Sequence, residues 1–212
     1  MFDKILSQTL LKSFFLVILI LFTLMTLPSK VFSQDSIRLN ENKQIEQSCE
    51  LTPSTVQGPY YKENSPFKQD LAKGTEGDKL VVSGKVMNFN CEPIKGAILD
   101  FWQADSQGEY DNVDFNLRGK VISDVNGNYT LKTIFPGSYS DGNLVRPSHI
   151  HVKAWIPENP GNPSLVTQLY FKGDPNMDQF VKEPLIINLN EKNGTKYANF
   201  DFVLEDYRGF GN

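Results

Sequence analysis

The sequence contains few histidines, few cysteines and no cluster of basic residues. Its 212 residues include only two histidines and two cysteines, and no segment is dense in lysine and arginine. The formal net charge is −4 at pH 7, so the basic surface that nucleic-acid-binding proteins present is missing. We therefore expect no nucleic-acid partner.

Helical periodicity, tandem repeats and low-complexity segments are absent after the N-terminus. The N-terminus itself combines two lysines with an apolar run, 14–27, which Pro28 ends, and Ser33 then offers a small residue at a cleavage position. This layout is typical of a secretory signal peptide, and the run is shorter than the roughly 20 residues that span a bilayer. We expect residues 1–33 to be a signal peptide and the mature protein to be exported, with no stable membrane span. An uncleaved anchor is the alternative.

The remaining chain divides into a short polar leader and one domain. Residues 34–48 are polar without any period and predict a flexible leader, whereas 49–212 is long enough for one domain with its own core. The domain contains Cys49 and Cys91. An exported protein permits a disulfide between them, and two unpaired thiols are the alternative.

Strand-like segments fill the domain after an irregular stretch at 49–77. Runs rich in β-branched and aromatic residues alternate with turn residues, and Asn126-Gly127 lies between two such runs as a strong hairpin signal. We predict an all-β fold, an antiparallel β-sandwich of about eight strands with active-site loops at their ends. The strands are expected at 80–86, 97–104, 120–123, 129–134, 149–155, 166–171, 185–188 and 198–203.

The two histidines, His149 and His151, fall on one of these expected strands. Residues i and i+2 of a strand point to the same face, so both imidazoles would reach one point in space. Such a pair is a simple beginning of a metal site. The alternative is that two rings share a strand face without binding anything.

Two tyrosines near strand ends offer further ligands: Tyr110 in WQADSQGEY and Tyr139 in FPGSY. Phenolate is a hard anionic donor, and because its pKa is ordinarily near 10, a strong Lewis acid is needed to deprotonate it at neutral pH. Two phenolates and two imidazoles would suit ferric iron, whereas zinc usually takes His, Cys or carboxylate ligands. Either tyrosine alone would be equally ordinary as a core or rim residue.

Five segments occur in one order along residues 49–203: CELTPSTVQGPYY, GKVMNFNCEPIKGAILDFWQADSQGEYDN, FNLRGKVISDVNGNYTLKTIFPGSY, RPSHIHVKAW and LVTQLYFKGDP. Together they resemble the intradiol ring-cleavage dioxygenases, which include the protocatechuate 3,4-dioxygenases and catechol 1,2-dioxygenases. The combination of WQAD-x3-EY, PGSY and RP-x-HIH is specific, because each motif supplies one or two of the expected ligands.

The resemblance implies a β-sandwich enzyme with non-haem Fe(III). It would cleave a small catecholic substrate between its two hydroxylated carbons with O₂ and give a cis,cis-muconate-type diacid. By motif, the active-site arginine of the family falls on Arg146 and a glutamine behind the ligands falls on Gln168. The implied iron ligands are Tyr110, Tyr139, His149 and His151. The resemblance further implies that Tyr139 accepts a catechol proton and that Arg146 stabilises charge on the ring.

Two other interpretations remain at this stage. Residues 80–139 also fit transthyretin-like and carboxypeptidase-regulatory-like sandwich modules, in which the same turns are structural and the protein is a non-enzymatic exported interaction module. A different metal site would complete the two histidines with Asp105 or Asp141 and bind Fe(II) or copper. The ring substituents of the substrate and the oligomeric state, including any partner subunit, are left open by the sequence.

Overall fold

The computed structural model describes residues 48–142 and 144–205 of the chain. The expected signal peptide, 1–33, and all but the last residue of the expected leader, 34–48, lie outside the described residues. Within the described ranges the secondary structure consists of strands and one short 3-10 helix. Those ranges include no helix with the length and apolar character needed to cross a membrane.

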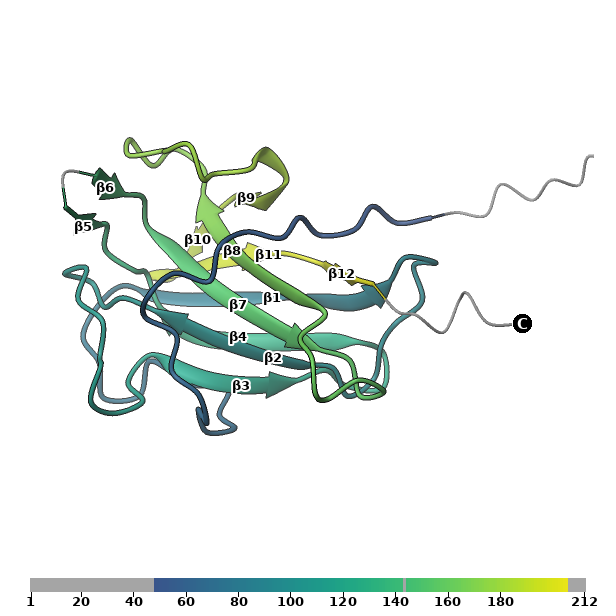
Figure 1. Cartoon of the computed structure of the whole chain (residues 1–212). Helices are drawn as coiled ribbons and strands as arrows, with labels where there is room; N and C mark the ends of the chain where they lie inside the picture. Colours follow the sequence, from purple (N-terminus) through teal and green to yellow (C-terminus); the bar gives the residue numbers. More distant parts are fainter. Residues whose placement is uncertain (1–47, 143, 206–212) are drawn as a thin grey trace, which may run out of the picture. The chain divides into compact units, whose positions relative to one another are not determined.

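The strands form two five-stranded sheets and a separate hairpin (Figure 1). Their bounds are β1 (Lys79–Asn88), β2 (Ile98–Gln103), β3 (Arg118–Ile122), β4 (Asn128–Ile134), β5 (Tyr139–Asp141), β6 (Leu144–Arg146), β7 (His149–Trp155), β8 (Leu165–Phe171), β9 (Ile186–Ile187), β10 (Asn190–Lys192), β11 (Thr195–Asn199) and β12 (Phe202–Leu204), with the 3-10 helix η1 at Glu183–Leu185. The first sheet has the order β10-β11-β1-β12, with β4 also paired to β1. The second has the order β3-β2-β7-β8-β9, and β5 pairs with β6.

The hydrophobic core lies between the two sheets, and strand alternation explains which residues enter it. In β2 the core residues are Leu99 and Phe101, and in β7 they include Ile150 and Val152. All four are fully buried. The first sheet contributes Leu80, Val82, Val86, Leu131 and Phe202. The predicted all-β sandwich is therefore confirmed.

The opposite face of the second sheet carries polar side chains, and one row across it is also buried. Strand register places Arg118, Trp102 and His151 side by side across β3, β2 and β7, and Gln168 of β8 continues the row. Each of the four is at most 1% exposed. A sheet covered on both faces usually carries apolar strands. A polar buried face instead requires other segments that cover it and satisfy its hydrogen bonds.

Residues 49–68, which we call the strap, cover this polar face. The strap passes β8, where the Thr55 N–H donates to the Val166 carbonyl at 2.8 Å. Further along, the Tyr61 hydroxyl donates to the buried carboxylate of Asp100 on β2 at 3.2 Å. In Figure 1 this dark blue segment passes across the second sheet from the side of β8. The expected irregular N-terminal segment thus becomes the lining of the polar face.

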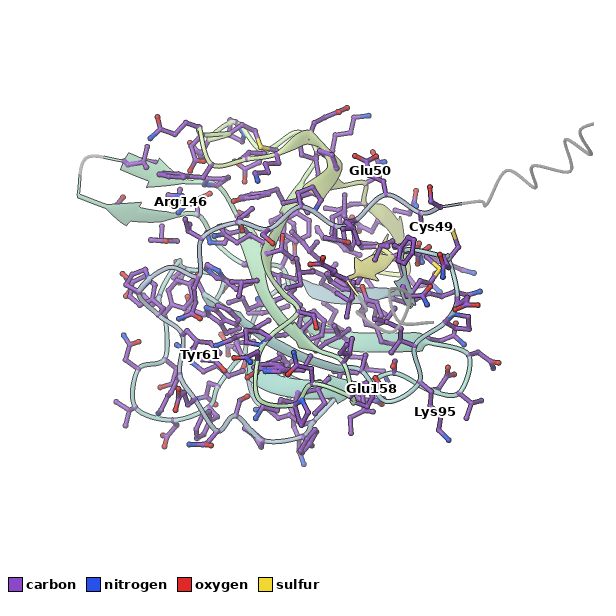
Figure 2. The ribbon with its side chains drawn as sticks, turned by 45° about the vertical axis from the view of Figure 1, so that its right-hand side comes forward. Cys49, Glu50, Tyr61, Lys95, Arg146 and Glu158 are labelled. Atoms are coloured by element: carbon purple, nitrogen blue, oxygen red, sulfur yellow. A yellow bond between two sulfur atoms is a disulfide. The ribbon has the colours of Figure 1, made fainter. Side chains whose placement is uncertain are left out.

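A disulfide fixes the start of the strap. Cys49 is bonded to Cys91 in the turn after β1, with their Cα atoms 5.3 Å apart, and the Cys49 N–H donates to the Phe89 carbonyl at 2.7 Å. Figure 2 shows the sulfur bond beside the label of Cys49. Of the two arrangements that the sequence allowed for the cysteines, the disulfide is the one present, and it ties the cover of the polar face to the first sheet.

Two features of the sheets differ from the predicted sandwich. The pairs β1–β11, β1–β12 and β8–β9 are parallel, although an antiparallel arrangement was expected, because hydrophobic alternation within a strand carries no information about its partner's direction. The expected strand 198–203 is divided between β11 and β12. The division occurs where the Phe200 carbonyl approaches Gly84 of β1 so closely that a Cβ on Gly84 would lie 1.8 Å from the carbonyl oxygen.

Loss of the disulfide should destabilise the domain. The bond joins residues 42 positions apart, so we expect the Cys49→Ser, Cys91→Ser double variant to lose about 2–4 kcal/mol of unfolding free energy. Urea denaturation measures the change. Reduced wild-type protein should match the variant, and the variant should not respond to reductant; equal midpoints for oxidised wild type and variant would contradict the expectation.

Candidate metal centre and active site

The two histidines meet on the buried polar face of β7. His149 is 2% exposed and His151 is 1% exposed. Their ring centroids are 4.6 Å apart, and their Nε2 atoms are separated by 3.0 Å. Strand alternation places both rings on this face, as the sequence predicted.

A hydrogen bond from the Nδ1 of His149 leaves its Nε2 directed at the Nε2 of His151, whose own Nδ1 has no partner among the described residues. The Nδ1 of His149 lies 2.6 Å from the Pro147 carbonyl, which can only accept, so the proton of neutral His149 is on Nδ1 and its Nε2 carries a lone pair. Burial lowers the pKa of His149 to about 4 and lowers the pKa of His151 well below its usual value. Both rings are therefore neutral at pH 7, as metal ligands must be.

Tyr110 brings a phenol oxygen to the same point. Its hydroxyl lies 3.1 Å from the Nε2 of His151, and its ring stacks on Tyr60 of the strap with centroids 4.2 Å apart. Burial raises the pKa of Tyr110 far above the ordinary value. Without a bound cation this phenol stays protonated, so a strong Lewis acid would be required to make it a phenolate ligand.

Tyr139, the first residue of β5, completes the group of rings. Its centroid is 5.5 Å from that of Tyr110 and 5.6 Å from that of His149. The hairpin that carries it was not among the expected strands. In that hairpin Tyr139 lies directly opposite Arg146 of β6, so the pairing of two short strands places a predicted ligand beside the predicted active-site arginine.

Glycines set the distance between the two tyrosine-bearing loops. A Cβ on Gly108, which has a φ of +88°, would lie 2.3 Å from the Ser138 carbonyl oxygen. A Cβ on Gly137 would lie 2.6 Å from the Gly108 nitrogen. The backbones that precede Tyr110 and Tyr139 can therefore touch only because neither glycine has a side chain.

The four predicted ligands fit a hard trivalent cation. Two neutral imidazole rings and two phenol rings come together from β7, from the loop after β2 and from β5, and this set of donor types suits ferric iron better than zinc. Within the described residues, no three His, Cys, Asp or Glu side chains gather as a metal site. Asp105 instead accepts the Gln107 and Glu109 N–H groups of its own turn, which argues against it as a third ligand, and the side chain of Asp141 lies outside the described part.

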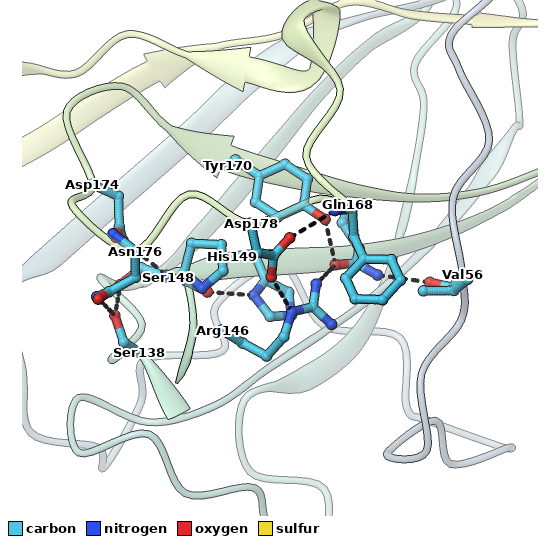
Figure 3. A network of polar contacts seen from close by, with 12 residues as sticks. Val56, Ser138, Arg146, Ser148, His149, Gln168, Tyr170, Asp174, Asn176 and Asp178 are labelled. Carbon is cyan, nitrogen blue, oxygen red and sulfur yellow. Dashed lines mark hydrogen bonds and ion pairs between the residues drawn. The ribbon is translucent and has the colours of Figure 1, made fainter. Parts of the chain in front are cut away.

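Arg146 and Gln168 belong to one hydrogen-bond network behind the rings (Figure 3). An Nη2–H of Arg146 donates to the Gln168 Oε1 at 3.1 Å, and the Tyr170 hydroxyl donates to the same oxygen at 2.7 Å. The Gln168 amide nitrogen donates to the Val56 carbonyl of the strap at 2.7 Å. The Arg146 Nε–H also donates to Asp178 at 2.6 Å, so the arginine is held from two sides.

Two residues near the site were not identified as site residues from the sequence. Trp102 stacks on His151 with centroids 4.7 Å apart and planes at 4°. Arg118 lies beside Tyr110, with its guanidinium 5.9 Å from the ring centroid, and donates to the Tyr60 carbonyl at 2.6 Å. The alternation of β2 and β3 indicates which residues share the face of His151, but only the strand register brings these residues into one row.

Comparison with known proteins decides the family, because a family model described as Dioxygenase matches residues 56–206. The chain belongs to the intradiol ring-cleavage dioxygenases. Chlorocatechol 1,2-dioxygenase from Pseudomonas sp. (strain P51) is 29% identical over 72% of this chain and 70% of that protein. 6-Chlorohydroxyquinol 1,2-dioxygenase from Cupriavidus pinatubonensis is 30% identical over 83% of this chain and 72% of that protein.

Solved structures of this dioxygenase family have the same fold. The dioxygenase domain of a dioxygenase carbohydrate-binding protein fusion from Streptomyces sp. SirexAA-E aligns with a TM-score of 0.67 and 42% identity, covering 74% of this chain and 99% of that chain. 3-Chlorocatechol 1,2-dioxygenase from Rhodococcus opacus 1CP aligns with a TM-score of 0.65 and 28% identity, covering 73% of each chain. The chain is therefore an enzyme, and its interpretation as a non-enzymatic interaction module is wrong.

Substitution of Tyr110 and Tyr139 should show whether their phenol groups bind the metal. We expect Tyr110→Phe to weaken iron retention and to reduce the red-brown colour that a ferric–phenolate pair gives, because a donor atom is removed. Tyr139→Phe should also change the absorption spectrum. Metal analysis and visible spectroscopy measure both effects, and Tyr197→Phe, at an exposed tyrosine of β11, is the control. Unchanged spectra and iron content in both site variants would remove the two tyrosines from the ligand set.

Proposed function

We propose that this protein is a non-haem Fe(III) dioxygenase that cleaves a small catecholic ring between its two hydroxylated carbons with O₂, giving a cis,cis-muconate-type diacid. The observation that carries the proposal is the convergence of two neutral imidazoles and two phenols, in a chain whose family acts on catechols between the hydroxylated carbons. This family uses non-haem iron, and the donor set fits that metal.

Four side chains would hold the iron: Tyr110, Tyr139, His149 and His151. Bound ferric iron would supply Lewis acidity that favours loss of the catechol protons and would hold both catechol oxygens in one place. The protein supplies the orientation. The Pro147 carbonyl fixes the tautomer of His149, and Trp102 fixes the plane of the His151 ring by stacking against it. Such support behind the ligands is as important to a metal site as the ligands themselves.

Tyr139, held as a phenolate when iron is bound, is proposed to accept one catechol proton at its oxygen and so become a neutral phenol. A general base must lie within hydrogen-bond reach of the proton that it takes, and the ring of Tyr139 is packed between those of Tyr110 and His149. Its place at the start of a three-residue strand, β5, gives it less surrounding structure than the histidines have in the centre of the second sheet. This difference suits a residue that changes its partner during the reaction.

Arg146 is proposed to stabilise the negative charge that develops on the activated ring. A guanidinium keeps its proton at any physiological pH and can stack on a planar ring, which an ammonium does not match. Arg146 is buried and lies opposite Tyr139 in the hairpin. Gln168 and Asp178 hold its orientation, so the charge would be preorganised before the substrate binds.

The named substrates of the relatives suggest the substrate class of this enzyme. Those relatives act on chlorocatechol and 6-chlorohydroxyquinol, each a single ring with adjacent hydroxyl groups. We propose a catechol of this size for the present site. The strap limits the space, because Tyr60 lies against both Tyr110 and Tyr139 and its ring closes one side of the group.

Oxygen uptake tests the proposed reaction. Iron-loaded protein should consume one O₂ per ring cleaved with at least one of catechol, protocatechuate and hydroxyquinol, and mass spectrometry after reaction in ¹⁸O₂ should show both labelled atoms in a muconate-type diacid. A product cleaved beside the diol rather than within it, or no uptake by fully loaded protein with any of the three, would contradict the proposal.

We also propose that the enzyme is exported. The N-terminal pattern of 1–33 supports this location, and so does the disulfide between Cys49 and Cys91, since such bonds persist in oxidising compartments. Mass spectrometry of fractionated cells should find a mature N-terminus near Gln34 outside the cytoplasmic membrane. Intact Met1 on cytoplasmic protein would exclude export and would leave the iron chemistry unaffected.

A further inference from the structure

The loop between β8 and η1, residues 172–182, contacts the site at three places, and we call it the clamp loop. Every second residue of its central part, from 174 to 178, directs a polar side chain toward the site (Figure 3). The contacts are Asp174 Oδ2 with the Ser148 N–H at 2.9 Å, Asn176 Nδ2 with Ser138 Oγ at 3.2 Å, and Asp178 Oδ2 with Arg146 Nε at 2.6 Å. The two aspartates accept hydrogen bonds, the asparagine donates one, and each side chain has a different partner.

The clamp loop contacts Arg146 and also two residues that are adjacent in sequence to proposed iron ligands. Ser138 immediately precedes Tyr139, and Ser148 immediately precedes His149. Arg146 is itself the proposed stabiliser of ring charge. One loop therefore contacts the backbone N–H next to His149, the hydroxyl of the serine next to Tyr139 and the side chain of the arginine. Lys182, at the end of the loop, donates to the Ser54 carbonyl of the strap at 2.7 Å.

The contact between Asp178 and Arg146 differs from the other ion pairs of the described residues because both partners are buried. Their side chains are 4% and 6% exposed, whereas the ion pairs of Lys196 involve carboxylates that are at least 63% exposed. The second oxygen of Asp178 accepts the Phe180 N–H at 2.8 Å, and the ring of Phe180 lies 4.9 Å from the guanidinium carbon. The carboxylate and the ring confine the guanidinium together.

We propose that Asp178 is a positioning residue which, through Arg146, sets the orientation of the guanidinium toward the reacting ring; this inference rests on the proposed ring-cleavage function. An arginine side chain has several rotatable bonds and loses much freedom when it is fixed. Asp178 and Gln168 engage its Nε and Nη2 groups separately, which defines the plane of the guanidinium as well as its location. Small displacements of a charge-stabilising group from the productive geometry have large effects on rate.

Asp178→Asn tests the inference with little change in shape. The amide keeps an oxygen acceptor but removes the charge that holds Arg146. We expect kcat for the best catechol to fall about 10- to 100-fold, while iron content and the spectrum of the substrate-free enzyme stay at the wild-type level. Asp78→Asn is the matched control, because it removes the exposed ion pair with Lys196 and should leave kcat unchanged.

A double-mutant cycle with Arg146→Ala separates positioning from a general structural role. In the wild-type background Asp178→Asn should lower the melting temperature by several degrees, because it leaves a buried guanidinium unpaired. In the Arg146→Ala background the same change should be neutral or should raise the melting temperature, since an unpaired buried carboxylate is replaced by an amide. The residual kcat of Arg146→Ala should not fall further in the double variant.

Asp178→Glu provides a variant that retains the charge. It should keep the melting temperature near that of wild type, yet its longer side chain displaces the guanidinium, so kcat should still fall several-fold. Wild-type kcat in Asp178→Asn, loss of iron in that variant, or additive effects in the cycle would each overturn the inference. Failure of the proposed function is a separate result, in which the wild-type enzyme cleaves no catechol although the unfolding cycle still reports the coupling of the two residues.

Discussion

The main physical constraint on this protein is that part of its second sheet is buried on both faces while only one of the two faces is apolar. The inner face packs against the first sheet, and the outer face carries a row from Arg118 to Gln168 that is as inaccessible as the core. Buried polar groups must be hydrogen-bonded or bind something. The strap, the hairpin β5–β6 and the clamp loop supply hydrogen bonds around the rim. Within the described residues, Trp102 Nε1, Arg118 Nη2 and His151 Nδ1 have no hydrogen-bond partner, and the two Nε2 atoms of His149 and His151 face one another at the centre.

Arg118 and Arg146 are both buried, and their charges are compensated in two different ways. Arg146 is paired with the carboxylate of Asp178. Arg118 makes no ion pair within the described residues, and it donates hydrogen bonds to the carbonyls of Tyr60 and Asp111. Carbonyl oxygens provide partial compensation for a buried charge without cancelling it. The positive charge of Arg118 beside Tyr110 is therefore only partly compensated. The charge of Arg146 is compensated by the carboxylate of Asp178.

Much of the site could be predicted from the sequence because its determinants are local. The i, i+2 spacing of His149 and His151 depends only on strand geometry, and the motifs around Tyr110 and Tyr139 lie within a few residues of each ligand. The remaining parts depend on contacts between distant segments. Asp178 lies 32 positions after Arg146, and nothing in the GDPNMDQF segment indicates which cation its carboxylate meets. The parallel pairs of β1 and the formation of the bond between Cys49 and Cys91 are set by tertiary contacts in the same way.

The close contact of Gly108 with Gly137 has a mechanical consequence for the site. Two backbones in direct contact have no side-chain rotamers between them, so the span between the loops of Tyr110 and Tyr139 is stiff. Tyr60 of the strap and Phe180 of the clamp loop instead meet the site through their side chains, against Tyr110 and Arg146 respectively. The spacing of the two tyrosine loops is therefore set by backbone contact, whereas these two rings can change position without altering it.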